Sequence, residues 1–337
     1  MTAAAPRGRV LDLDRIDGFA DARGAAMRSH AQFTVTRWNE DHSSGFNVAV
    51  VTPQKTLADE PVIFPMSYDY RIEPLVLRRL EVLAIVAGRR VIAVETPGVT
   101  LDFDNPASTA PSTVAGEQAR AGLLGDYTGL AALQLEAVIE IAGVVPSRAR
   151  FLGESLGAQA VMSMSEGFTP LSVDLVEPVN CLPQGPIALL RLGRTLGRVE
   201  EPLRSRYVAR SIERGWTTPG VFEKSSPANA EVDRRLKRFD RQGRWAALSA
   251  LAMRRGLLRS ADFIGPTTPL RVWRGAESTA SKPNDIARFI GTLVAAGRHA
   301  EWFTLKLDGM PAGHHVLTDL DAATAFALEL RRLWDAE

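Results

Sequence analysis

The sequence predicts an α/β protein in which helices cover both faces of a mainly parallel, doubly wound β-sheet, with one helical insertion. Short strand-like runs alternate with segments of helical periodicity along most of the 337 residues. A hairpin pattern opens this series, and no strand-like run occurs between residues 179 and 263. Such alternation is typical of a parallel sheet that lies between two layers of helices.

The hairpin is indicated by residues 33–38 and 46–51, in which apolar and polar side chains alternate with period two. A polar, turn-like stretch at 39–45 separates them. Residues 1–31, ahead of the hairpin, are rich in Ala, Arg and Asp and have weak periodicity. We expect them to form a loosely helical lead-in.

After the hairpin, short apolar runs alternate with longer segments whose apolar residues recur at helical spacing. The strands are expected at residues 61–64, 90–95, 148–152, 171–176, 270–273 and 302–307. The helices are expected at 72–87, 129–142, 156–166, 285–296 and 319–334, with a loop of small and polar residues at 104–125. Residues 32–178 and 265–337 therefore form the α/β core, and residues 179–264 form the helical insertion.

The bulk composition indicates an ordinary soluble protein. The chain carries 40 basic and 39 acidic residues, so its net charge of +1 gives no bias toward nucleic acid or a membrane. Its one cysteine, Cys181, cannot form an intramolecular disulfide and fits a reducing compartment. The sequence shows neither a secretion signal nor a run of about eighteen apolar residues, so we expect a cytoplasmic protein without a transmembrane segment.

The strand at 148–152 runs directly into Gly-Glu-Ser-Leu-Gly at 153–157, and a helix follows at once. A serine at the tip of such a tight turn exposes its hydroxyl above the sheet, and small neighbours let strand and helix approach. The first amide of the helix, that of Leu156, would face a developing oxyanion. Ser155 is therefore the candidate nucleophile; a glycine-flanked helix N-cap is the alternative.

The candidate general base is a histidine that follows the last strand. In this architecture the order along the chain is serine, acid and histidine. Three histidines lie before the serine or at the end of a helix: His30, His42 and His299. We select His314, which follows a glycine in the loop before the last helix, with His315 as the alternative. A pair of solvated loop histidines is the remaining interpretation.

Two carboxylates compete for the role of the acid that orients the imidazole. Glu277 lies in the loop after the strand at 270–273, and Glu177 follows the preceding strand. Asp285 is more simply an acidic residue at a helix N-terminus. The residues alone leave Glu277 and Glu177 both open.

With these residues in hand, the chain resembles the α/β-hydrolase superfamily, specifically its cap-bearing members. The resemblance spans residues 32–178 and 265–335 and rests on four motifs: Gly-Glu-Ser-Leu-Gly at 153–157, Glu-Thr-Pro-Gly at 95–98, Arg-Gly-Ala-Glu at 274–277 and Ala-Gly-His at 312–314. It implies that residues 179–264 form a lid that shapes substrate choice.

The sequence departs from the family pattern at two places that affect the site. The family's His-Gly after the third strand is replaced by Phe-Pro-Met-Ser-Tyr at 64–68, so the second oxyanion amide is expected from Met66 or Ser67. The family's usual acid position, three residues after the glycine, is occupied by Ser278. Glu277 lies one residue before that position, so Glu177 remains an alternative for the acid.

The resulting expectation is hydrolysis of a carboxylic ester or thioester through an acyl-enzyme, with no metal or organic cofactor. Acyl transfer at the same site and a catalytically silent binding protein are the alternatives. Residues 191–260 hold 17 basic and 7 acidic residues, a net of +10. This charge fits a small-molecule substrate or partner with an anionic part, or a lid that arginines merely keep soluble. No stacking platform or reading motif accompanies it, so no nucleic-acid partner is expected.

Overall fold

We describe a computed structural model of the chain. The structure describes residues 8–38, 46–66, 72, 74–96, 127–185, 196–216 and 256–337. The predicted loop at 104–125 lies outside these residues. So do parts of the insertion, residues 186–195 and 217–255.

The centre of the molecule is a nine-stranded sheet with the order β1-β9-β8-β7-β6-β4-β5-β3-β2. Its strands are β1 (Arg9–Asp12), β2 (Ala31–Trp38), β3 (Phe46–Pro53), β4 (Val62–Pro65), β5 (Val91–Val94), β6 (Arg150–Glu154), β7 (Ser172–Val176), β8 (Leu270–Gly275) and β9 (Ala300–Lys306). β3 runs antiparallel to both of its neighbours, and every other pairing is parallel. The predicted hairpin is β2–β3, and the mainly parallel sheet is confirmed.

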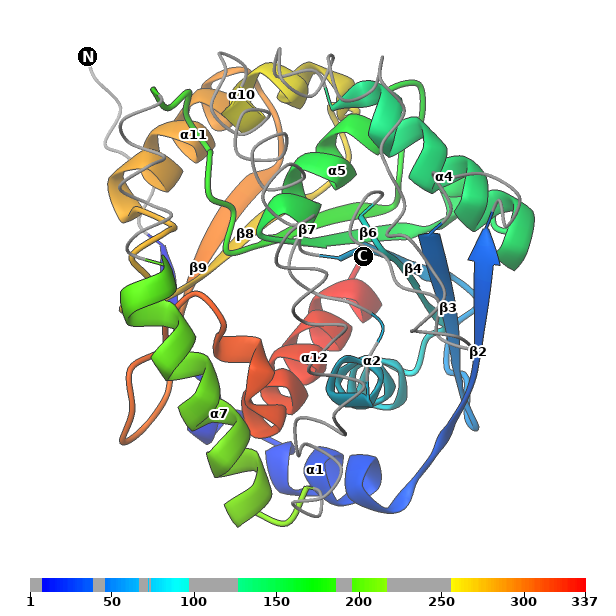
Figure 1. Ribbon diagram of the computed structural model, residues 1–337. Helices are drawn as coiled ribbons and strands as arrows, with labels where there is room; N and C mark the ends of the chain where they lie inside the picture. Colours follow the sequence, from blue (N-terminus) through cyan, green and yellow to red (C-terminus); the bar gives the residue numbers. More distant parts are fainter. Residues whose placement is uncertain are drawn as a thin grey trace.

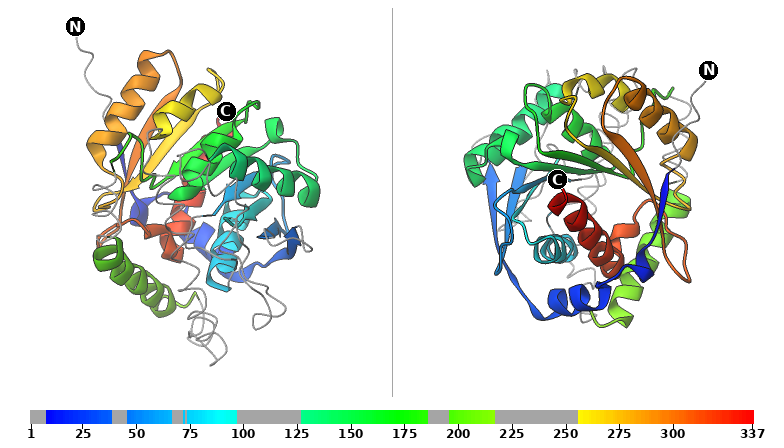
Figure 2. Two further views of the ribbon diagram at one scale, coloured as in Figure 1. Left: turned by 45° about the horizontal axis from the view of Figure 1, so that its top comes forward. Right: turned by 180° about the vertical axis from the view of Figure 1, so that it is seen from behind.

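Helices cover both faces of this sheet, as predicted (Figures 1 and 2). One layer contains α4 (Thr128–Ala142), α5 (Leu156–Met164), α10 (Gly256–Ser260) and α11 (Pro283–Ala295). The other contains α1 (Phe19–Arg28), α2 (Pro74–Ala87), α7 (Glu201–Glu213) and α12 (Leu320–Asp335). Each layer has its own apolar core. On β6, Phe151 faces the first core and Leu152 the second, because successive side chains of a strand point to opposite faces.

The prediction of a loosely helical lead-in was wrong for part of residues 1–31. β1 adds a ninth strand, parallel to β9, at the edge of the sheet. The helix α1 then packs on α2 and α12. The four residues of β1 have the burial pattern of an edge strand, half-buried or exposed, so they lack the apolar run by which a central strand is recognised.

Residues 179–185 of the insertion form no regular element, and its other described parts are mainly helical. A π-helical turn at Leu196–Glu200 leads into α7, which lies beside α12 (Figure 1). The buried face of α7 presents Leu203, Tyr207 and Ser211, which recur at intervals of four residues, as expected for an amphipathic helix. The boundaries 179–264 and the role of a lid remain predictions. No helix in the described part of the chain combines the length and apolarity needed to cross a bilayer.

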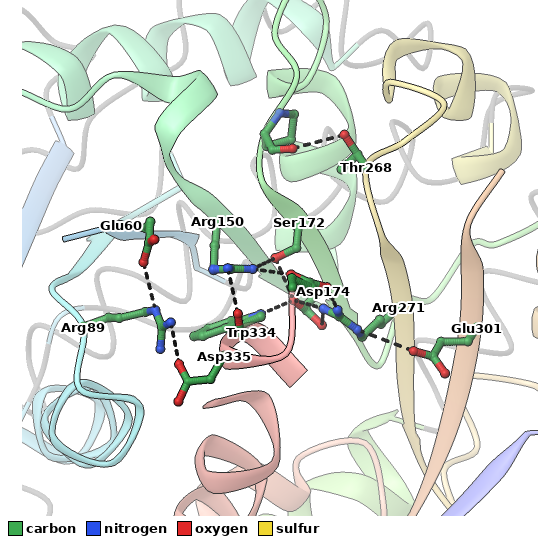
Figure 3. A network of polar contacts seen from close by, with 12 residues as sticks. Glu60, Arg89, Arg150, Ser172, Asp174, Thr268, Arg271, Glu301, Trp334 and Asp335 are labelled. Carbon is green, nitrogen blue, oxygen red and sulfur yellow. Dashed lines mark hydrogen bonds and ion pairs between the residues drawn. The ribbon is translucent and has the colours of Figure 1, made fainter. Parts of the chain in front are cut away.

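A buried polar network joins the sheet to the last helix (Figure 3). Asp174 of β7 accepts hydrogen bonds from the indole nitrogens of Trp273 and Trp334, each at 3.0 Å, and pairs with Arg271 at 3.3 Å. Arg150 donates to the carbonyl of Trp334 at 3.1 Å. Burial and the neighbouring charge of Arg89 lower the pKa of Arg150 to about 10, so it stays charged at neutral pH. The network fixes α12 against β6, β7 and β8.

Candidate active site

Ser155 lies at the tip of the turn between β6 and α5, as the sequence predicted. Its backbone has φ 53° and ψ −113°, one of two positive φ values among the described non-glycine residues. The amide of Ser155 donates to the carbonyl of Val176 at 2.9 Å, which completes the β6–β7 ladder. The strained conformation is therefore held by the sheet itself, and strain of this kind is common at catalytic residues.

The two glycines of the pentapeptide are explained by close backbone contacts. A Cβ atom on Gly153 would lie 2.4 Å from the carbonyl oxygen of Gly157, and one on Gly157 would lie 2.1 Å from that of Pro65. Both distances are far below van der Waals contact. Gly153 thus lets strand and helix approach each other, and Gly157 lets α5 approach the end of β4.

The structure brings His314 to the serine. The Nε2 atom of His314 lies 3.0 Å from Oγ of Ser155, and the imidazole is 2 % exposed. His315 packs edge-on against His314, with 4.9 Å between ring centroids. Of the other histidines, His30 is exposed and lies 3.6 Å from Glu81, and His299 is exposed. His42 lies outside the described residues.

Glu177 is the carboxylate that reaches the imidazole. Its Oε2 atom lies 3.3 Å from Nδ1 of His314 and accepts a hydrogen bond from the hydroxyl of Ser278 at 2.6 Å. The amide of Gly275 donates to Oε1. Glu177 is fully buried and has the second positive φ, 50°, so the chain turns sharply where β7 ends.

The expectation for Glu277 is corrected by the structure. Its side chain is exposed and accepts a hydrogen bond from the amide of Ala312 at 2.8 Å, and the amide of Glu277 donates back to the carbonyl of Ala312 at 3.0 Å. Glu277 therefore ties two loops together without contacting the imidazole. Ser278, at the family's usual acid position, supports the acid of the neighbouring strand.

These surroundings set the protonation of His314. Burial alone lowers the pKa of an imidazole, because it disfavours the charged form. The hydrogen bond and charge of Glu177 oppose this effect, and the charges of Glu154 and Glu200 add to Glu177. The net result is a raised pKa for His314. With Nδ1–H donating to Glu177, Nε2 is left to accept the proton of Ser155.

The expected oxyanion site is described in part. Leu156 is the first residue of α5, where an amide has no acceptor within the helix. The amide of Met66, in contrast, donates to the carbonyl of Val94 at 2.9 Å and belongs to the sheet. Of the two candidates after β4, Met66 is thus already engaged. Ser67 lies outside the described residues.

One acidic cluster within the described ranges has the spacing of metal ligands, formed by Asp12, Asp14 and Asp308. Arginines already neutralise it: Arg210 lies 2.9 Å from Asp14, and Arg15 lies 3.2 Å from Asp12. Asp285 lies in the first turn of α11, as expected. Neither feature adds a chemical group to the serine site.

Two further residues, which no sequence pattern predicted, contact the histidine loop. Glu200 accepts a hydrogen bond from the amide of His314, and Tyr207 accepts one from the amide of Gly313, each at 2.7 Å. Both belong to the insertion, far along the chain from residue 314. No local pattern marks such contacts, because they depend on where α7 docks.

Comparisons with known proteins identify the fold. No protein-family model matches the chain, and no curated protein sequence matches it. Solved structures do match. A putative lipase from Acinetobacter baumannii AYE has a TM-score of 0.54 and 11% identity, covering 98% of this chain and 99% of that one. A laboratory-evolved variant of potato epoxide hydrolase has a TM-score of 0.53 and 11% identity, covering 91% and 100%.

A third structure, a serine hydrolase from the hydrocarbon-degrading bacterium Cycloclasticus zankles, has a TM-score of 0.52 and 11% identity. The match covers 90% of this chain and 99% of that one. At such identities the likeness concerns architecture alone, and the activities for which these proteins are named differ from one another. This chain has the α/β-hydrolase fold.

Proposed function

We propose that this protein is a serine hydrolase that cleaves a carboxylic ester or thioester through an acyl-enzyme intermediate. The observation that carries the proposal is one continuous chain of contacts. It runs from Oγ of Ser155 to Nε2 of His314, and from Nδ1 of His314 to the carboxylate of Glu177. Nucleophile, base and orienting acid are thus within reach of one another, which is the geometry that activates a serine.

The residues assign the steps of the reaction. Oγ of Ser155 attacks the acyl carbon while Nε2 of His314 takes the hydroxyl proton. The buried carboxylate of Glu177 stabilises the imidazolium that forms. The oxyanion of the tetrahedral intermediate is bound by the amide of Leu156, with Ser67 as the expected second donor. Collapse breaks the bond to the alcohol or thiol, which leaves with the proton from His314.

Water then completes the cycle. His314 removes a proton from the water, which attacks the acyl-enzyme, and returns that proton to Oγ of Ser155 as the carboxylic acid leaves. An acyltransferase would use an alcohol or amine in place of this water. The third alternative, a silent binding protein, rests on the unusual sequence after β4 and on the displaced acid; the contact between Glu177 and His314 argues against the second of these.

Substrate and location remain predictions. An ester or thioester with an anionic part is favoured by the net charge of +10 over residues 191–260, of which 191–195 and 217–255 lie outside the described residues. A cytoplasmic location is favoured by the single cysteine. A panel of p-nitrophenyl esters and acyl thioesters, including coenzyme A derivatives, tests the substrate class.

A fluorophosphonate probe tests the nucleophile directly, because phosphonylation joins Oγ to phosphorus with loss of fluoride. We expect the folded protein to be labelled at Ser155, and Ser155→Ala to be unlabelled. Ser147→Ala is the matched control, since Ser147 is an exposed serine just ahead of the same strand. Absence of labelling in the folded wild-type protein, while a reference serine hydrolase reacts, would contradict the proposal.

The pH dependence of labelling provides a second test. Ser155 is activated only when His314 is neutral, and the pKa of His314 is raised above its ordinary value of about 6.5. The second-order labelling rate should therefore rise with pH, with its midpoint above that value. A midpoint at or below it would show that Glu177 does not stabilise the imidazolium as inferred.

A further inference from the structure

The start of α7 meets the histidine loop through a buried carboxylate. Glu200 is 0 % exposed and accepts three hydrogen bonds: from the amide of His314 at 2.7 Å, and from the amide and hydroxyl of Thr279 at 3.1 and 2.7 Å. Thr279 belongs to the loop after β8, next to Ser278, which supports Glu177. Glu200 therefore connects two loops: the one that carries His314, and the one that carries Ser278, the hydrogen-bond partner of Glu177.

A second side chain of α7 holds the same loop. The hydroxyl of Tyr207 accepts from the amide of Gly313 and donates to the carbonyl of Pro311, both at 2.7 Å. Glu200 and Tyr207 are seven residues apart, about two helical turns, so they face the same way. Two consecutive amides, those of Gly313 and His314, are thus fixed by the insertion. A Cβ on Gly313 would lie 2.4 Å from Oε2 of Glu200, which explains the glycine.

The described part of the chain places no cation against the carboxylate of Glu200. Within the described ranges it forms no ion pair with lysine or arginine, and its donors are two amides and a hydroxyl. The imidazole of His314 is faced by Glu177 from the end of β7, Glu154 from β6, Glu200 from the insertion, and the ring of His315. Of these carboxylates, Glu177 contacts the ring and Glu154 is paired with Arg79 at 2.8 Å.

We propose that Glu200 is a positioning residue: it fixes the backbone of His314, and its negative charge stabilises the imidazolium formed when Ser155 attacks. The inference rests on the proposed function and adds to it. It makes the insertion part of the catalytic machinery, since a residue of the insertion sets the position and basicity of the general base. Tyr207 also fixes the backbone of the histidine loop, but it does not stabilise the imidazolium, because its hydroxyl is neutral.

The experiment separates the two tasks with three variants. Glu200→Gln removes the charge and leaves one acceptor oxygen for two amides and a hydroxyl. We expect its fluorophosphonate labelling rate to fall about tenfold, and the midpoint of the pH profile to move to lower pH. Tyr207→Phe removes both loop contacts without changing charge, so we expect a slower rate and an unchanged midpoint. Thr279→Val should behave like Tyr207→Phe, with a decrease of about threefold.

A purely structural role for Glu200 predicts that all three variants lose rate with the same midpoint, and that result overturns the proposal. NMR titration of the His314 imidazole supplies a readout independent of catalysis, in which only Glu200→Gln should shift the midpoint. If the wild-type protein is not labelled at Ser155 but this titration shifts as expected, the proposed function fails and the charge effect stands. If Glu200→Gln does not fold, an undiminished labelling rate in folded Thr279→Val and Tyr207→Phe overturns the positioning role.

Discussion

Two buried carboxylates lie three residues apart at β7, Asp174 within the strand and Glu177 just after it, and they have opposite surroundings. Both are 0 % exposed. Asp174 is paired with a guanidinium, that of Arg271, and accepts from two indoles. Glu177 accepts from an amide, a hydroxyl and the imidazole of His314. Within the described residues it has no lysine or arginine partner, and Arg274 donates to loop carbonyls instead.

One strand can thus place a structural acid and, in the proposed function, a catalytic acid three residues apart. The charge of Asp174 is already neutralised by Arg271, so this carboxylate holds helix α12 in place. A further positive charge nearby would add little to its stability. A charge held only by neutral donors is stabilised further when its histidine becomes an imidazolium. Among the described residues, Glu177 and Glu200 share this second arrangement, and both contact the histidine loop.

The largest effect should come from Glu177→Gln. The amide cannot stabilise an imidazolium and can invert the hydrogen bond to Nδ1, so we expect the esterase or labelling rate to fall by about 10³-fold or more. The free energy of unfolding should change far less. Rates are measured on protein whose fold is checked by circular dichroism; a loss under tenfold would contradict the role of Glu177.

Asp174→Asn should show the reverse of this pattern: a large loss of stability with little change in the labelling rate. It leaves Arg271 and two indole N–H groups facing an amide, and breaking a buried pair in this way costs about 3 kcal/mol of stability. Urea unfolding measures this cost, while the labelling rate per folded molecule should stay within about twofold of wild type. Asp335→Asn is the control, because Asp335 is half exposed and its pair with Arg89 contributes under about 1 kcal/mol.

Ser278→Ala tests the support of the acid. It removes the hydroxyl that donates to Glu177 at 2.6 Å, leaving the amide of Gly275 and the imidazole as partners. A lost hydrogen bond to a carboxylate corresponds to about 1.5–3 kcal/mol, so we expect a decrease in labelling rate of about tenfold or somewhat more. An unchanged labelling rate would show that the hydrogen bond from Ser278 to Glu177 does not contribute to the reactivity of Ser155.

Glu277→Gln should have the smallest effect. The exposed carboxylate contacts the amide of Ala312, and a glutamine oxygen can accept the same hydrogen bond. We expect a labelling rate within about threefold of wild type, which makes this variant the matched control for Glu177→Gln. Equal effects of the two substitutions would remove the distinction between the two carboxylates.

Features that depend only on residues adjacent in the sequence could be predicted from it. The strand, the pentapeptide at 153–157 and the helix after it follow one another along the chain, so the turn at Ser155 needs no distant partner to be recognised. His314 was found because it follows the last strand and a glycine. The edge strand β1 was missed, since four residues paired on one side carry too little apolar signal.

Local periodicity and local turn chemistry were enough to predict the alternation of strands and helices, the candidate nucleophile and the candidate general base. Which of Glu177 and Glu277 contacts the imidazole depends, in contrast, on tertiary structure. Both follow strands whose ends meet at the same edge of the sheet, so only the positive φ at Glu177 and the packing of the loops determine which carboxylate reaches Nδ1. The contact of Glu200 with the histidine loop was decided in the same way, by the docking of a helix that is distant in sequence.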